Sequence, residues 1–174
     1  MKKLFFIFIA LLFVSTVVYG QQPRIDTRAK FKSIFIYNFT KYVEWPEAYR
    51  EGDFVIGVVG GSSLYGMLKS SSKDKKVNNQ TVVVKKFASI DEVDKCHILY
   101  ISEDFKDVAG AVAKIKEHNT LVVTEGPGLV DNYSAINFVV VANALKFELN
   151  KGNIKKYNLT MSNSLERLAT KVVN

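Results

Sequence analysis

The chain has 174 residues, with 24 basic and 17 acidic side chains and a formal net charge of +7. Its single cysteine, Cys96, excludes an intramolecular disulfide, so the fold has to be stabilised by its hydrophobic core. The modest basic excess is typical of a solvated surface, and it also suits contact with anionic lipid headgroups or cell-wall polymers.

Residues 1–20 have the pattern of a secretory signal peptide. Two lysines precede an apolar run over residues 4–14, and Gly20 stands before a plausible cleavage site. The run is shorter than the roughly 20 apolar residues of a membrane-spanning helix. We therefore expect an exported protein whose mature part, residues 21–174, forms one domain. Because we expect the protein to be exported, we do not expect nucleic acid as a partner.

The first structured element is predicted over residues 26–46, DTRAKFKSIFIYNFTKYVEWP. Asp26 or Thr27 can cap a helix here, and Pro46 disfavours the helical conformation of the residue before it, so the helix is expected to end near Glu44. Apolar side chains recur at three- and four-residue spacing and predict one buried stripe. The stripe consists of Phe31, Ile34, Phe35, Asn38, Phe39 and Tyr42.

Strands and helices alternate along the rest of the chain. Apolar, β-rich runs predict strands at 54–59, 81–87, 97–101, 121–124, 135–141 and 145–149. Helical spacing predicts helices near 62–69, 105–118 and 162–173, with shorter turns at 89–92 and 151–157. The last two strands are expected to form a tight hairpin with Asn143 at positive φ. The pattern predicts a single α/β domain: a mixed sheet of about six strands, covered by helices on both faces, ending in a β-hairpin and a C-terminal helix.

Several stretches carry a family signature. They include FIYNFTKYVEWP at 35–46, INFVVVANALKFELN at 136–150 and YNLTMSNSLERLATKV at 157–172, and in these the chain resembles the YfiR/HmsC-like family. The resemblance implies a periplasmic α/β regulator that binds the periplasmic domain of an inner-membrane diguanylate cyclase and restrains cyclic-di-GMP output and biofilm formation. Such relatives can use disulfides for redox control, and the single Cys96 departs from that pattern.

The C-terminal end of the predicted first helix is the candidate partner surface. Tyr37, Lys41, Trp45 and Pro46 lie there, and tyrosine and tryptophan are enriched where protein surfaces meet partners. The alternative for Trp45 is a hydrophobic plug under the turn at Pro46.

A second candidate site lies at the Gly-rich turn after the first strand. Backbone N–H groups of Gly60, Gly61 and Ser62 could cradle an anion. The turn lacks the G-x-G-x-x-G pattern and a Walker lysine, so a dinucleotide or nucleoside triphosphate is not expected. Glu125 and Asn137 are expected to line a small pocket with this turn at the carboxyl ends of the strands. The alternative is a tight turn that simply requires glycine.

The sequence does not contain a recognisable catalytic constellation. Its two histidines, His97 and His118, are unclustered, and Cys96 adjoins His97 in a strand, where their side chains point to opposite faces. We therefore expect a non-enzymatic protein without metal or cofactor that binds the periplasmic domain of a membrane cyclase or sensor kinase, with a homodimer left open. The runner-up is a periplasmic small-molecule or cell-wall-fragment binding protein, and a third hypothesis is an uncharacterised hydrolase.

Overall fold

The computed structural model describes residues 26–115 and 118–174, so the expected signal peptide lies outside the described residues. The helices and 3-10 turns (η) are α2 Thr27–Phe39, η1 Glu47–Tyr49, α3 Leu64–Ser71, η2 Ile90–Glu92, α4 Val108–Ile115, α5 Leu129–Asn132, α6 Lys151–Lys156 and α7 Asn163–Leu168. The strands are β1 Val43–Glu44, β2 Phe54–Val59, β3 Lys76–Val77, β4 Gln80–Phe87, β5 Ile98–Ile101, β6 Leu121–Glu125, β7 Ile136–Val141, β8 Ala144–Asn150, β9 Thr160–Met161 and β10 Lys171–Val173.

The main sheet of the described chain has eight strands in the order β10-β8-β7-β6-β5-β2-β4-β3. The five strands from β4 to β7 in this order are parallel, and β8 returns antiparallel to β7. The hairpin turns at Ala142 and Asn143, which have φ angles of 48° and 62°, so the expected positive φ at Asn143 is confirmed. The predicted mixed α/β sheet is also confirmed. Its two additional strands, β3 and β10, are too short to give an apolar pattern.

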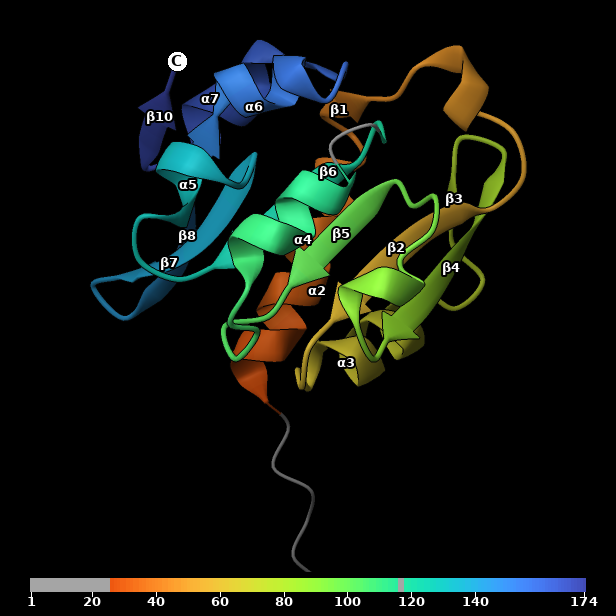
Figure 1. The fold of residues 1–174 in the computed structure, drawn as a ribbon, viewed down its shortest axis with the longest axis horizontal. Helices are drawn as coiled ribbons and strands as arrows, with labels where there is room; N and C mark the ends of the chain where they lie inside the picture. Colours follow the sequence, from red (N-terminus) through yellow and green to blue (C-terminus); the bar gives the residue numbers. More distant parts are fainter. Residues whose placement is uncertain (1–25, 116–117) are drawn as a thin grey trace, which may run out of the picture.

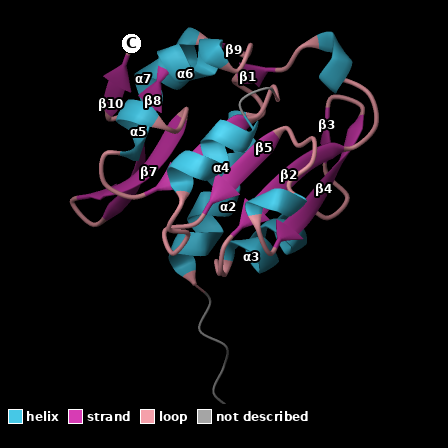
Figure 2. Ribbon diagram, viewed as in Figure 1, coloured by secondary structure: helices cyan, strands magenta, loops and turns pink. Residues whose placement is uncertain are grey.

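Helices cover both faces of this sheet (Figures 1 and 2). The ribbon of α4 passes in front of the sheet and α2 lies behind it, with α3 packed beside α2. Aromatic rings join α2 to the sheet: the Phe39 ring meets those of Phe138 and Phe147 at centroid distances of 6.0 and 5.2 Å. Such pairs add to the free energy of simple burial.

Helix α2 is shorter than predicted and buries a different face. Asp26 does cap it, accepting hydrogen bonds from the N–H groups of Arg28 and Ala29 at 3.1 Å. The prediction that Phe31 and Ile34 are buried is wrong, because these side chains are 49% and 45% exposed. The buried residues of α2 are Ala29, Lys32, Ser33, Ile36 and Phe39. The hydrophobic pattern missed this face because it includes a lysine.

The helix ends at Phe39 and not near Glu44, because the chain becomes extended before the proline. Val43 and Glu44 form β1, which pairs antiparallel with β9 at Met161 and Thr160. The local sequence favours this geometry only at Trp45, the residue preceding Pro46. The rest of the extended segment depends on β9, which lies more than a hundred residues away in sequence.

The predicted C-terminal helix is also too long. It ends at Leu168, whose side chain is 55% exposed, and residues 171–173 form β10 parallel to β8. Thr170 anchors this change of direction, because its N–H and its hydroxyl both donate to the carbonyl of Phe147, at 2.9 and 3.0 Å. The β-branched residues in this stretch favour the extended conformation.

Candidate functional site

Trp45, the candidate partner residue, points into the protein. Its side chain is 7% exposed, and its ring packs edge-on against Phe54 with a centroid distance of 5.0 Å. Its indole N–H donates to the carbonyl of His97 at 3.0 Å. Trp45 therefore fixes the segment after α2 onto β2 and the start of β5, which is the plug interpretation of this residue.

His97 is the buried polar residue behind Trp45. The N–H of Val55 donates to its Nδ1 at 3.0 Å, so Nε2 carries the proton and donates to the carbonyl of Tyr49 at 2.7 Å. The ring also stacks on Phe54 at 4.2 Å. Burial lowers the pKa of His97, which keeps the imidazole neutral. His97 thus joins β2 to η1 as a structural group.

We expect His97 to make folding stability pH-dependent. Its pKa is lowered in the folded state, so the unfolded state binds more protons as pH falls below about 6.5. The free energy of unfolding should therefore drop between pH 7.5 and 5.5, as measured by urea unfolding. His97→Asn should be less stable and show a flatter pH response than the wild type. An unchanged slope in His97→Asn contradicts this assignment.

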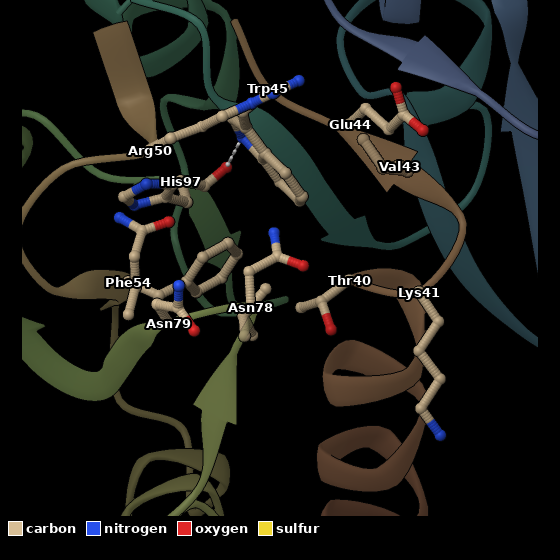
Figure 3. Close-up of a pocket in the computed structure, with 12 residues that line it drawn as sticks. Thr40, Lys41, Val43, Glu44, Trp45, Arg50, Phe54, Asn78, Asn79 and His97 are labelled. Atoms are coloured by element: carbon tan, nitrogen blue, oxygen red, sulfur yellow. Dashed lines mark hydrogen bonds between the residues drawn. The ribbon is translucent and has the colours of Figure 1, made fainter. Parts of the chain in front are cut away.

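A cavity of about 560 Å³ opens beside these rings (Figure 3). The end of α2 and the β3–β4 turn form its other walls, and Figure 3 shows the Lys41 side chain extending away from the opening. Gln80 also lines the cavity, and its side-chain amide donates to the carbonyls of Tyr49 and Glu51 at 3.0 and 3.2 Å. The lining residues are Thr40, Lys41, Val43, Glu44, Trp45, Arg50, Phe54, Val77, Asn78, Asn79, Gln80 and His97.

The four residues of the candidate partner surface thus differ in burial. Lys41 is exposed, while Tyr37 and Pro46 are half-buried and Trp45 is inside. The Tyr37 hydroxyl donates to the carbonyl of Lys76 at 3.1 Å, which holds the β3–β4 hairpin against α2. Sequence reasoning missed the contribution of this hairpin. Its signal was the Asn78-Asn79 pair just before the β-rich run 81–87, since paired asparagines are typical of a turn.

The second candidate site is a shallow depression of about 400 Å³ at the carboxyl ends of β2, β5 and β6. Of the five residues expected to form this site, Ser62 and Glu125 line the depression, whereas Gly60, Gly61 and Asn137 do not. Glu125 forms an ion pair with Lys32 and accepts a hydrogen bond from the Tyr100 hydroxyl at 2.7 Å. The Lys32 and Glu125 side chains are only 11% and 19% exposed. Burial, and then the bond to Glu125, raise the pKa of Tyr100.

The protein itself supplies an anion to the Gly-rich turn. The N–H of Gly61 donates to both carboxylate oxygens of Asp104, at 2.9 and 3.2 Å. A hydrogen bond from Ser102 and the one from Gly61 hold the pKa of Asp104 below its ordinary value. Asn137 has no exposed surface; it donates to the Gly126 carbonyl at 2.9 Å and so supports the loop after β6 from behind.

Gly60 should be the position of this turn that tolerates substitution least. Its φ is +97°, and an added Cβ would lie 2.1 Å from the Ser102 hydroxyl oxygen. We expect Gly60→Ala to lower the free energy of unfolding by more than about 1 kcal/mol. Gly66→Ala is the matched control, since nothing lies within 4 Å and alanine favours the helix by about 1 kcal/mol. Equal chemical unfolding midpoints for the two variants would contradict this prediction.

Comparison with known proteins decides the family. The family model described as YfiR/HmsC-like matches residues 29–170, which is most of the chain. The chain belongs to the YfiR/HmsC-like family. No match was found among curated proteins. The YfiR/HmsC-like family is known for periplasmic regulators of diguanylate cyclases. Both the cavity at Trp45 and the depression at Glu125 lie inside the matched range.

Among the residues that the structure describes, no group of three or more His, Cys, Asp or Glu side chains could hold a metal ion. Cys96 is buried, and burial raises the pKa of its thiol to about 12, so the reactive thiolate is disfavoured. Across the described ranges, the helices are too short or too polar to cross a membrane.

Proposed function

We propose that this chain is an exported, non-enzymatic regulator that binds the periplasmic domain of a membrane signalling protein, a diguanylate cyclase or a sensor kinase, and represses or tunes it. The observation that carries the proposal is the YfiR/HmsC-like match over residues 29–170. The signal-peptide pattern of residues 1–20 supports the location. Neither the buried thiol of Cys96 nor the hydrogen-bonded ring of His97 is placed for catalysis.

The partner surface of this proposal is the signature surface, which we define as Tyr37, Lys41 and Pro46. Trp45 and His97 hold these residues in place from below through the bond between the indole N–H and the His97 carbonyl. Lys41 is the exposed member, so it should contribute electrostatic complementarity and association rate more than stability. A change of its charge therefore tests binding without disturbing the fold.

The test is a measurement of cyclic-di-GMP and surface attachment in a strain that lacks the chain. Restoring the wild-type chain should change both, and Lys41→Glu should lose most of this effect while keeping the wild-type melting temperature. Lys155→Glu, an exposed charge reversal on α6, is the matched control. If Lys41→Glu regulates like the wild type, the signature surface is wrong. If the wild-type chain changes neither readout, regulation of a cyclase is wrong.

The alternative, a periplasmic small-molecule or cell-wall-fragment binder, has one observation in its favour. Ser62 and Glu125 border the same depression, with Lys32 beside them. Thermal-shift screening with wall fragments and nucleotides tests it. A melting shift that survives Trp45→Ala but disappears in Gly61→Val would favour this alternative.

A further inference from the structure

We propose that the outer edge of β4 binds an extended, acidic segment of a partner protein by strand addition. Three features meet at this edge: unpaired backbone groups, an apolar groove with a buried hydroxyl, and a rim of lysines. The inference concerns the chemistry of the bound segment. It therefore stands whatever activity the partner has.

The edge of β4 is covered only at its beginning. β3 pairs with it through Lys76 and Val77, and the N–H of Val82 donates to the Lys75 carbonyl at 3.0 Å. Beyond Val82, no strand in the described parts of the chain pairs with the outer side of β4. Backbone groups alternate in direction along a strand, so those of Val84 and Lys86 also face outward. These are the groups that a strand added from a partner would pair with.

A groove runs beside this edge, between α3 and β4. It has a volume of about 580 Å³, and its apolar wall is formed by residues 82–84. Lys69 and Lys73 lie at its rim. Ser72 also lines it, and its buried hydroxyl has no hydrogen-bond partner among the described residues. Residues 82–84 give the groove an apolar wall, so it fits an occupant that carries apolar side chains on one face.

The charge of the residues around β4 indicates which kind of polypeptide segment would bind there. Residues 69–87 contain a single acidic side chain, Asp74. The lysines of this stretch are Lys69, Lys73, Lys75, Lys76, Lys85 and Lys86, all exposed. Lysines on an edge strand repel an identical edge, so a second copy of this chain is disfavoured here. An acidic segment would neutralise them. Anionic lipid or nucleic acid would use the charge but leave the outward backbone groups of β4 unpaired.

The lysine rim continues into the signature surface. The Lys75 ammonium lies 4.3 Å from the centroid of the Tyr37 ring, and the Lys41 ammonium lies 5.9 Å from it. An extended segment along β4 would thus approach Tyr37 at its end. This continuity allows one partner to contact both surfaces.

The test uses the purified chain and a fluorescent peptide of alternating glutamate and valine, followed by anisotropy. We expect saturable binding that weakens as salt is added. A peptide with lysine in place of glutamate should not bind. The acidic peptide with every backbone amide N-methylated should bind at least tenfold more weakly, because neither of its edges can donate to the outward carbonyls of β4.

Variants of the chain give the second arm. Lys85→Glu should weaken binding of the acidic peptide at least tenfold, while Lys155→Glu should not. Val84→Pro removes one outward N–H and leaves the ladder to β2 intact, so it should fold and bind at least tenfold more weakly. If Val84→Pro does not fold, the N-methylated peptide decides, since it leaves the protein unchanged.

Three outcomes would overturn the proposal. Absence of saturable binding to the acidic peptide would show that the outer edge of β4 does not bind such a segment. Equal binding of the N-methylated peptide would reduce the contact to charge alone. Phosphatidylglycerol vesicles that bind with the same dependence on Lys85 and displace the peptide would assign the rim to a membrane surface.

Discussion

Replacing Trp45 by alanine should lower the free energy of unfolding by about 3–5 kcal/mol, the usual cost of removing a large aromatic side chain from a core. The ring is 7% exposed and packs on Phe54, and its N–H pairs the His97 carbonyl. For a domain of this size the melting temperature should fall by about 10 °C. Urea unfolding measures the free energy change and a thermal scan measures the melting temperature. Both are followed by circular dichroism, because the variant lacks the only tryptophan.

Two controls separate packing from hydrogen bonding. Trp45→Phe keeps a ring against Phe54 but loses the indole donor, so its cost should be smaller, about 1–3 kcal/mol. Phe31→Ala removes a ring that is 49% exposed and should cost less than about 1 kcal/mol. If Trp45→Ala unfolds within about 1 kcal/mol of the wild type, Trp45 is not the plug that holds the signature surface.

Breaking the Lys32–Glu125 pair should be the second large effect. Glu125→Ala leaves a poorly exposed ammonium on Lys32 and a Tyr100 hydroxyl without its acceptor, and we expect a loss of about 3 kcal/mol. Lys32→Met leaves the carboxylate alone and should cost a similar amount. Urea unfolding midpoints measure both.

The double variant tests the physical reason. Lys32→Met combined with Glu125→Ala leaves no lone charge, so its loss should be smaller than the sum of the two single losses. Asp131→Asn is the matched control, because it breaks an exposed pair with Lys171 and should cost less than about 1 kcal/mol. Strict additivity of the single losses would mean that Lys32 and Glu125 do not stabilise one another.

The sequence was sufficient where a structural feature depends on neighbouring residues. Six apolar runs became the six longer strands of the main sheet, and Ala142-Asn143 turns the hairpin as expected. It failed where a feature depends on a distant partner. Lys32 is buried because Glu125 meets it, and β10 forms because Phe147 offers a carbonyl to Thr170.

The candidate sites follow the same rule. Ser62 and Glu125 come together because parallel strands end at one edge of the sheet, which the order of elements predicts. That Asp104 occupies the N–H of Gly61 could not be read from the turn itself. Trp45 has an aromatic side chain of the kind enriched at partner surfaces, and it also precedes a proline. The sequence alone therefore leaves open whether its ring points outward or into the core, and the packing on Phe54 decides this.

Photo-crosslinking from position 41 in living cells tests the central proposal most directly. A photoreactive amino acid at Lys41 should join the chain to an inner-membrane signalling protein through that protein's periplasmic domain, as identified by mass spectrometry, while the same group at Lys155 should not. Repeated absence of any membrane signalling protein from the position 41 products, with the chain exported and folded, would contradict the regulator account.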